Sequence, residues 1–284
     1  MNGSDRVVGV LGRGVVDADA PQVLADDLGL TRGDGCFDAL RVVKGAGRVR
    51  LDHEDAHLAR FARSAALLDM DPIDLPAWRA LIDETVAAWP GTREGFCKVI
   101  WTRGPEYAPG DHVGLVLVGR TPPSGVPLRV ATLTTGRPSD AFADAPWLLG
   151  GVKTLSYGVN VAAKREAARR GADDVLFVSA DGYLLEGPTS ALIVARDGVL
   201  STTPVEGTGI LSSVTAAVIA AQAAEHGLEF RHRLMIPEEL HVADGAWLVS
   251  AIRGVCPIIE VDGAGINLHA QATETLTRWA GFAD

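Results

Sequence analysis

The chain has 284 residues and a formal net charge of −10, with 47% hydrophobic and 22% charged residues. This is the composition of a soluble globular protein, and the length is sufficient for two domains. The acidic balance supplies no basic stripe for nucleic acid or an acidic membrane surface, and no apolar run approaches the roughly 20 residues that a membrane helix needs.

Three cysteines are present, and they are too far apart for a CxxC pair. Cys36, Cys97 and Cys256 are therefore expected to be reduced, buried thiols in a cytoplasmic protein. The N-terminus has no long apolar core followed by a cleavage site, so no secretory signal is expected.

Strand and helix patterns alternate over the first 120 residues. The predicted strands are residues 6–16, 36–51 (a hairpin that turns at Lys44–Gly47), 96–104 and 112–120, and the predicted helices are residues 52–70 and 76–89. The strands follow from β-branched and aromatic runs between glycines, and the helices from apolar residues that recur every three or four positions. Asp52 is the predicted N-cap of the first helix.

Residues 121–127 contain clustered proline and glycine that cannot continue a helix or a strand, which predicts a linker. The second half of the chain again alternates. Its predicted strands are residues 128–134, 174–180, 190–196, 245–252 and 256–263, and its predicted helices are residues 157–171, 212–227 and 269–280. The sequence thus predicts a mixed α/β (α+β) protein with an N-terminal domain at 1–120 and a C-terminal domain at 128–284.

The stretch "HEDAH" (His53–His57) satisfies the H-E-x-x-H pattern of zinc hydrolases. On a helix this spacing places two imidazoles on one face, with the glutamate as base. The extended form with a third histidine is absent, because Arg60 stands where its glycine belongs. The same helix carries His57, Arg60 and Ser64 as a polar stripe. That stripe is either a solvated face or a mount for an arginine that clamps a phosphate or carboxylate.

Two further stretches have both a structural and a functional interpretation. "GTGILSSVT" leads a glycine loop into a helix start, which either binds an anion or is simply capped by Ser212 or Ser213. Lys153 in "GGVKTLSYGVN" has small and apolar neighbours, and Glu186 in "LLEGPTS" follows a strand. A lysine in apolar surroundings is expected to have a lowered pKa and to serve as a nucleophile and base. Either residue could also be an ordinary loop charge.

Together these stretches resemble the class IV aminotransferases, the fold-type IV pyridoxal-phosphate enzymes. The resemblance covers about residues 32–263. Its landmarks, in family order, are "GDGCFDALRV", "HLARF", "KTLSYGVNVAAKREA", "GYLLEGPTSALIV", "GTGILSSVT" and "LVSAIRGVCPIIEVDG". The family includes branched-chain and D-amino-acid aminotransferases and 4-amino-4-deoxychorismate lyases. The resemblance implies a two-domain fold with the cofactor at the domain interface, pyridoxal 5'-phosphate as cofactor, no metal and a homodimer.

The resemblance also implies a role for each matching residue. Lys153 would form the Schiff base, and Glu186 would pair with the pyridinium nitrogen. Arg60 would hold the phosphate, and "HEDAH" then belongs to the helix that delivers it. The remaining cofactor contacts would come from Val214, Thr215, Ala251 and Ile252. Branched-chain enzymes have a tyrosine five residues after the lysine. In this chain Tyr157 stands four residues after Lys153, so it departs from that pattern.

The resemblance leaves the reaction open between pyruvate elimination from aminodeoxychorismate, for folate synthesis, and transamination. "TRGDGCFDAL" and "IRGVCPI" look closer to the lyases, which we take as the first expectation, although Asp38 stands where some lyases have a hydroxyl residue. In "APGDHVG", His112 is retained, but Gly110 replaces the arginine of the D-amino-acid enzymes. Candidate residues for binding a small-molecule substrate are Arg103, His112, Arg137, Arg253 and Tyr157.

Overall fold

The computed structural model describes residues 6–45, 48–91, 93–108 and 110–282. It divides into two compact units, which are Met1–Pro122 with Val152–Tyr157, and Pro123–Gly151 with Gly158–Asp284. The change of unit after Pro122 falls inside the predicted linker. The segment Val152–Tyr157, which contains Lys153, belongs to the first unit although the chain on both sides of it belongs to the second.

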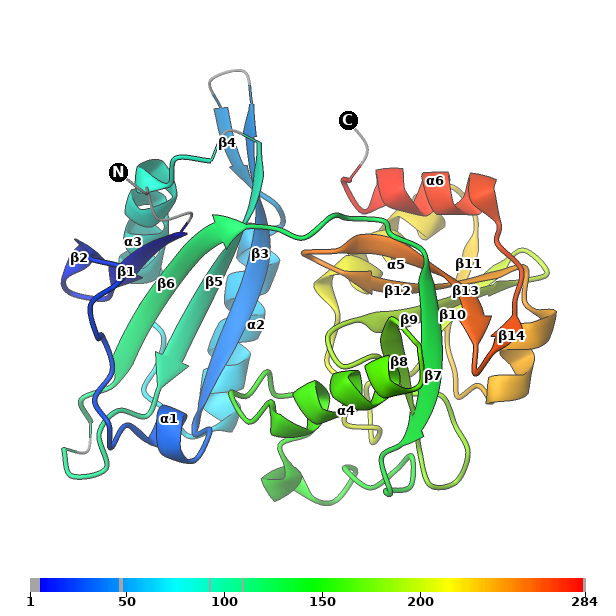
Figure 1. Cartoon of the computed structure of the whole chain (residues 1–284), viewed down its shortest axis with the longest axis horizontal. Helices are drawn as coiled ribbons and strands as arrows, with labels where there is room; N and C mark the ends of the chain where they lie inside the picture. The colour runs from blue at the N-terminus through cyan, green and yellow to red at the C-terminus, as the bar shows by residue number, and fades with distance from the viewer. Residues whose placement is uncertain (1–5, 46–47, 92, 109, 283–284) are drawn as a thin grey trace. The chain divides into compact units, whose positions relative to one another are not determined.

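The first unit is built on one antiparallel sheet with the strand order β2-β1-β6-β5-β3-β4 (Figure 1). Its strands are β1 (Arg6–Val10), β2 (Gly14–Val16), β3 (Gly35–Gly45), β4 (Arg48–Leu51), β5 (Glu94–Thr102) and β6 (Val113–Arg120). The predicted strand at 6–16 is therefore two strands. β3 and β4 form the predicted hairpin, while two residues of its turn, 46–47, lie outside the described residues.

Two helices pack on one face of this sheet (Figure 1). The helices of the unit are α1 (Leu28–Thr31), α2 (Glu54–Leu67) and α3 (Leu75–Ala88). Leu58, Phe61 and Trp78 are almost fully buried between the helices and the strands. The predicted N-cap of α2 is wrong. His53 occupies the cap position in a left-handed conformation, and Asp52 instead forms ion pairs with Arg41 and Arg50.

The second unit is built on a mixed sheet with the order β11-β10-β9-β12-β13-β7-β8, and β14 pairs with β13. Its strands are β7 (Leu128–Thr134), β8 (Asp174–Val178), β9 (Ala191–Arg196), β10 (Val199–Thr202), β11 (Glu229–His232), β12 (Gly245–Ser250), β13 (Gly254–Val261) and β14 (Ala264–Gly265). The pairs β7–β8, β7–β13 and β10–β11 are parallel, and the remaining pairs are antiparallel.

Helices cover this second sheet through separate apolar clusters. They are α4 (Gly158–Arg169), α5 (Val214–Glu225) and α6 (Ala270–Trp279), with short 3-10 helices at Pro146–Leu148 and Pro237–Val242. α5 and α6 share a cluster centred on Ile193, Ile219 and Trp247, while α4 packs against β7 and β8 through alanines. The mixed α/β prediction is confirmed, and each predicted helix is present within a few residues of its expected bounds.

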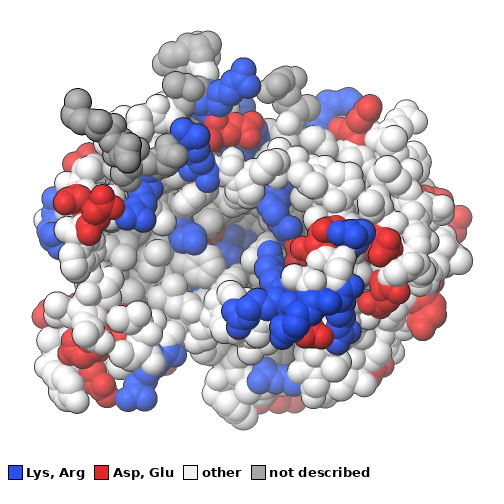
Figure 2. Space-filling view, in the orientation of Figure 1, with Lys and Arg blue, Asp and Glu red and all other residues white. Residues whose placement is uncertain are grey.

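The charged surface is mixed. On the face shown in Figure 2, basic side chains gather over α4, with acidic side chains among and beside them. Arg169 and Arg170 at the end of this helix both pair with Glu166, which partly neutralises the group. No helix in the described part of the chain is long and apolar enough to span a membrane.

Candidate active site

Lys153 lies on a short extended segment that runs beside β3. The Phe37 amide donates to the Lys153 carbonyl over 2.9 Å, and the Leu155 amide donates to the Gly35 carbonyl over 2.9 Å. Gly35 allows this close approach, because a Cβ there would lie 2.8 Å from Cδ1 of Leu155. The backbone of Lys153 is therefore fixed by strand-like pairing within the first unit.

The side chain of Lys153 is half-buried among aromatic rings. Its Nζ lies 4.7 Å from the centroid of Phe37 and 5.9 Å from that of Tyr157. The two rings meet edge to face with 5.1 Å between their centroids. Aromatic faces attract an ammonium group while removing water from it. Tyr157, a candidate substrate residue, thus lies beside the Lys153 amine.

Arg60 on α2 is held by a buried carboxylate from β3. Its Nε and one Nη donate to the two oxygens of Asp38 over 2.8 and 2.7 Å, as a bidentate fork. His57 Nδ1 lies 2.8 Å from Asp38 Oδ1, and Asp38 is fully buried. Burial alone would raise the pKa of Asp38, but the hydrogen bonds and charges of Arg60 and His57 hold that pKa well below its usual range.

The polar stripe on α2 is buried rather than solvated. The exposed fractions of His57, Arg60 and Ser64 are 1%, 9% and 1%, so the expectation of a solvated helix face is wrong. The Ser64 hydroxyl accepts the backbone N–H of Lys153 over 3.2 Å. Burial lowers the pKa of His57, against the opposing effect of Asp38, and Nδ1 donates to the Asp38 carboxylate. In the described part of the chain, no cluster of three or more His, Cys, Asp or Glu side chains could hold a metal ion.

Glu186 lies in the second unit, between β8 and β9, and is half-buried. Its Oε1 accepts the Leu211 amide over 3.2 Å, and its carbonyl accepts the Phe177 amide over 2.9 Å. The carboxylate is therefore tied to the loop that leads into α5. Thr203 supports the same stretch, because its hydroxyl donates toward the carbonyls of Leu184 and Leu185.

Two backbone features of the second unit are suited to an anion. α5 begins at Val214 and Thr215, both buried, and Ser213 caps the helix by accepting the Ala216 amide over 3.2 Å. The first amides of a helix lack intrahelical acceptors and carry the positive end of its dipole. Of the two predicted caps, Ser212 and Ser213, it is Ser213 that caps the helix.

The second backbone feature is a tight turn between β12 and β13. Ala251 and Ile252 lie in this turn and are half-buried. The hydroxyl of Ser250 accepts the Arg253 amide over 3.2 Å, which closes the turn. Ala251 and Ile252 therefore lie in a turn that a side-chain hydrogen bond closes.

Arg253 is occupied by groups of this chain. Its Nη2 lies 2.6 Å from Oδ2 of the fully buried Asp174 and donates to the Ser190 hydroxyl over 2.7 Å. Lys164 Nζ lies 3.8 Å from the other Asp174 oxygen. A substrate-binding role for Arg253 would require this buried ion pair to break.

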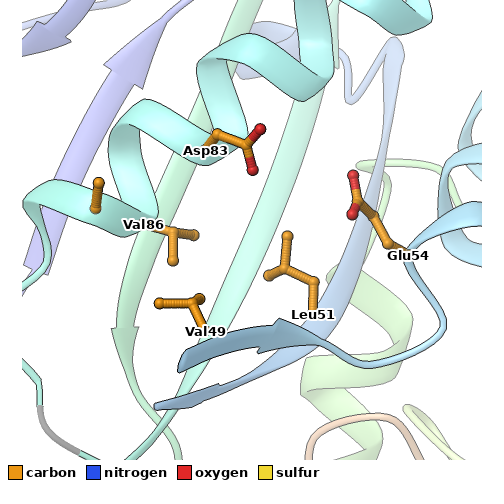
Figure 3. A pocket seen from close by; sticks show the side chains of 6 residues that line it. Val49, Leu51, Glu54, Asp83 and Val86 are labelled. Atoms are coloured by element: carbon orange, nitrogen blue, oxygen red, sulfur yellow. The ribbon is translucent and has the colours of Figure 1, made fainter. Parts of the chain in front are cut away.

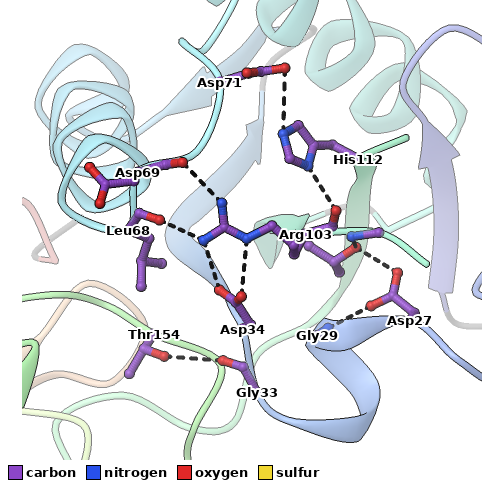
Figure 4. Close-up of polar contacts among 12 residues, drawn as sticks. Asp27, Gly29, Gly33, Asp34, Leu68, Asp69, Asp71, Arg103, His112 and Thr154 are labelled. Atoms are coloured by element: carbon purple, nitrogen blue, oxygen red, sulfur yellow. Dashed lines mark hydrogen bonds and ion pairs between the residues drawn. The ribbon is translucent and has the colours of Figure 1, made fainter. Parts of the chain in front are cut away.

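Arg103 and His112 belong to a second occupied network, drawn in Figure 4. Arg103 donates to both oxygens of Asp34 over 3.0 and 3.1 Å and to the carbonyls of Leu68 and Asp69. His112 Nδ1 donates to the Arg103 carbonyl over 2.9 Å. These contacts fix the loops around the end of β5 and leave little of the Arg103 guanidinium for a ligand.

Arg137 has a different setting from the other substrate candidates. It is exposed in the second unit, and its guanidinium lies 5.5 Å from the centroid of Phe142. Phe142 itself packs against Gly209, where a Cβ would lie 2.3 Å from the ring. Arg137 thus stands over a ring that is fixed to the glycine loop before α5.

The predicted residues divide between the units. The first unit holds Arg60, Arg103, His112, Lys153 and Tyr157, and the second holds Arg137, Glu186, Val214, Thr215, Ala251, Ile252 and Arg253. The structure brings Lys153 together with Tyr157, and with Arg60 through Ser64 on the same helix. It brings Glu186 together with the loop before α5.

Sequence reasoning missed Lys98 on β5. Its Nζ lies 5.5 Å from the centroid of Phe37, the same ring that Lys153 contacts, and 6.0 Å from that of Phe96. Burial lowers the pKa of Lys98. The signal was present as a lysine inside an apolar strand pattern, on the face opposite to the buried Cys97 and Val99.

The pocket drawn in Figure 3 is a separate feature of the first unit. It is lined by Val49, Leu51, Glu54, Asp83, Val86 and Ala87, at α3, β4 and the start of α2. None of the predicted site residues lines it. Its aliphatic floor and two carboxylates offer neither an amine nor an anion-binding group.

The three cysteines are free and buried, as predicted. Burial, with a smaller contribution from Asp38, raises the pKa of the Cys36 thiol to about 12. Burial likewise raises the pKa values of Cys97 and Cys256. Such thiols stay protonated and unreactive at neutral pH.

Residues 35–261 match the amino-transferase class IV family. A bifunctional aminodeoxychorismate lyase / D-amino acid transaminase from Mycobacterium tuberculosis is 36% identical over 256 residues, which are 86% of this chain and 87% of that protein.

Two solved structures extend the match to the fold. A fold IV-transaminase from Curtobacterium pusillum has a TM-score of 0.89 and 38% identity, covering 98% of this chain and 97% of its own. The PLP-bound form of a hypothetical aminotransferase from Mycobacterium tuberculosis has a TM-score of 0.89 and 33% identity, covering 97% of each chain. The chain therefore belongs to the class IV aminotransferase family of enzymes, and it has their fold-type IV architecture.

Proposed function

We propose that this chain is a pyridoxal-phosphate-dependent 4-amino-4-deoxychorismate lyase, which releases pyruvate and 4-aminobenzoate for folate synthesis. The observation that carries the proposal is the half-buried amine of Lys153, which lies over two aromatic rings. The backbone amide of Lys153 bonds to Ser64, on the helix that carries Arg60. The lyase activity in the name of the tuberculosis relative supports this reaction, and the transaminase activity in the same name supports the second candidate below.

The donor set of the chain fits pyridoxal phosphate. An amine suits its aldehyde, a carboxylate suits its pyridine nitrogen, and a guanidinium with a helix N-terminus suits its phosphate. Lys153, Glu186 and Arg60 supply the three side chains. We assign the remaining phosphate contacts to the first amides of α5, at Val214 and Thr215, and to the turn at Ala251 and Ile252.

Lys153 Nζ is the group to which we assign proton transfer. It takes the proton from the substrate carbon that carries the amino group. The bound cofactor supplies the electron withdrawal that makes this carbon acidic. The bond from the ring carbon to the enolpyruvyl oxygen breaks, and the ring becomes aromatic. The protonated Nζ returns its proton to the leaving group, which departs as pyruvate.

Lys98 is our candidate for binding a substrate carboxylate. Both lysine nitrogens lie near the Phe37 ring. The distance to its centroid is 5.5 Å for Lys98 Nζ and 4.7 Å for Lys153 Nζ. Cross-strand neighbours of Lys98 are Ala39 and Leu117, which bring no charge. No carboxylate in the described part of the chain forms an ion pair with Lys98, so a half-buried cation faces an apolar surface without a counter-charge. A carboxylate-bearing substrate would supply that charge.

A second candidate function is amino-acid transamination with 2-oxoglutarate or pyruvate as acceptor, acting on D-amino acids or branched-chain amino acids. The match to the Curtobacterium pusillum transaminase favours it. The same Lys153 would then return the proton to the cofactor side rather than to a leaving group. Both reactions therefore use the residues assigned above.

The deciding experiment supplies cofactor-loaded protein with aminodeoxychorismate and measures 4-aminobenzoate and pyruvate. A parallel reaction contains D-alanine or leucine with 2-oxoglutarate. We expect equal amounts of the two lyase products, and none from Lys153→Ala. Product from the amino-acid pair alone would overturn the lyase in favour of the transaminase. A well-folded protein that neither binds pyridoxal phosphate nor forms either product would overturn both.

Replacing Lys98 by methionine tests the carboxylate assignment. We expect KM for aminodeoxychorismate to rise about 10-fold or more, since a charged hydrogen bond is lost, while kcat changes less. Lys44→Met is the matched control, because Lys44 also lies over an aromatic ring, that of Trp89, in the same unit. Equal KM values for Lys98→Met and Lys44→Met would refute the assignment.

We further propose that the enzyme is a cytoplasmic homodimer. The family resemblance supports the dimer, and three free thiols support a reducing compartment. Light scattering of the eluting protein tests the dimer, and a monomeric mass at micromolar concentration would contradict it.

A further inference from the structure

The buried carboxylate of Asp38 has no place in the reaction described above. It sits on β3 with no exposed surface, and it accepts hydrogen bonds from Arg60 and from His57. A buried pair of this kind is commonly neutral for stability when compared with apolar residues of the same volume. Its geometry therefore calls for another explanation.

We propose that Asp38 is a positioning residue for the cofactor: its carboxylate, braced by His57, fixes the plane of the Arg60 guanidinium so that Arg60 meets the phosphate group. This inference rests on the proposed function. Arg60 donates through both Nε and Nη2 to the two oxygens of one carboxylate. Two parallel hydrogen bonds fix the direction of a guanidinium as well as its place.

The strand that carries Asp38, β3, also positions Lys153. Adjacent residues of a strand point to opposite faces, so Phe37 and Asp38 serve two different groups. The Phe37 amide and ring contact Lys153, and the Asp38 carboxylate contacts Arg60. One dipeptide of β3 thereby sets the amine and the guanidinium relative to each other.

Helix α2 connects Arg60 and Lys153 a second time. Arg60 and Ser64 lie one turn apart on the buried stripe, and the Ser64 hydroxyl accepts the Lys153 amide over 3.2 Å. A shift of α2 against β3 would therefore displace both groups together. The Asp38 fork ties α2 to β3 at this level, which keeps the phosphate-binding and amine positions in register.

The test compares two probes, pyridoxal phosphate and pyridoxal, which lacks the phosphate. Each is titrated into apoprotein and its Kd is measured. For Asp38→Asn we expect the Kd of pyridoxal phosphate to rise about 10-fold to 100-fold, in the range of other residues that orient a ligand-binding side chain. The Kd of pyridoxal should change little. Unchanged Kd values, or equal rises for both probes, would overturn the proposal.

Asp27→Asn is the matched control, since Asp27 is another fully buried aspartate of the same unit and bonds to Thr102 and backbone amides. It should leave the ratio of the two Kd values unchanged. A ratio that shifts as much in Asp27→Asn as in Asp38→Asn would also overturn the proposal.

His57 gives an independent route if Asp38→Asn does not fold. His57→Asn keeps an N–H donor for Asp38, and His57→Phe removes it. We expect the Kd of pyridoxal phosphate, divided by that of pyridoxal, to rise in His57→Phe and to return close to the wild-type value in His57→Asn, whereas equal ratios would contradict the brace. Failure of wild-type protein to bind pyridoxal phosphate would instead reject the proposed function itself.

Discussion

Each unit of the enzyme buries an aspartate against an arginine, but the two pairs differ in geometry. In the first unit, Asp38 accepts an aligned fork from Arg60, whose side chain is 9% exposed. In the second unit, Asp174 Oδ2 lies 2.6 Å from Arg253 as an ion pair without hydrogen-bond alignment, and Arg253 is 19% exposed. Both aspartates are fully buried.

The difference indicates two kinds of task. A fork specifies the orientation of a guanidinium, which matters when that guanidinium must meet a ligand. An unaligned pair with a second cation, Lys164 at 3.8 Å, mainly neutralises a buried charge. Arg253 also holds Ser190, so it ties the turn after β12 to the loop before β9. We infer that the first pair is directional and the second is electrostatic.

Removing each carboxylate is the strongest way to break the comparison. Asp38→Ala removes the carboxylate that compensates the buried charge of Arg60, so we expect a loss of about 3–5 kcal/mol in the free energy of unfolding. Asp174→Ala should cost less, about 1–3 kcal/mol, because the more exposed Arg253 can be hydrated and keeps its bond to Ser190. Urea denaturation measures both losses. Equal losses would remove the distinction between the two pairs.

Low pH separates the two pairs further, because Asp38 also bonds to a histidine, His57. The pKa of His57 lies below its ordinary value of 6.5, owing to burial, and that of Asp38 is also lowered. Both groups bind more protons when unfolded, so their contribution to stability is present at high pH and is lost as pH falls. The loss begins near pH 6.5 for His57 and follows below about pH 3.8 for Asp38.

His57→Gln should therefore flatten the fall in unfolding free energy between pH 7.5 and pH 5.5, while keeping a donor for Asp38. Urea titrations at the two pH values measure this. Lys164→Gln is the control from the second pair. A profile in which His57→Gln loses as much stability as wild type over this interval would contradict the assignment.

The smallest effects come from the serines. Ser64→Ala and Ser190→Ala each remove one hydrogen bond and should each cost about 0.5–1.5 kcal/mol of stability. Their effects on catalysis should differ, since Ser64 holds the Lys153 backbone and Ser190 holds Arg253. We expect Ser64→Ala alone to slow the exchange of the substrate proton with solvent, measured by NMR in D₂O. Equal exchange rates in the two variants would contradict the distinct role given to Ser64.

The sequence predicted the helices and the family well, because amphipathic periodicity and six ordered landmarks are local signals. Three strands, β10, β11 and β14, were missed, since each has four residues or fewer. The placement of Lys153 in the first unit depends on backbone pairing with β3, which no local pattern reveals.

The buried stripe on α2 illustrates the limit of periodicity. Spacing predicted correctly that His57, Arg60 and Ser64 share a face, but it could not show what covers that face. The face contacts Asp38, on a strand distant in sequence, and Lys153, on a segment from beyond the linker. Likewise, Arg103 and His112 looked available until their partners Asp34 and Asp71 were located.

The most direct test asks which amine holds the cofactor. Protein loaded with pyridoxal phosphate is reduced with borohydride, digested, and examined by mass spectrometry for the modified lysine. Lys98 provides an internal competitor, because its amine lies over the same Phe37 ring. We predict modification at Lys153, and its loss from the Lys153→Ala variant. Modification at Lys98 in the wild type, or none in well-folded protein, would contradict the account.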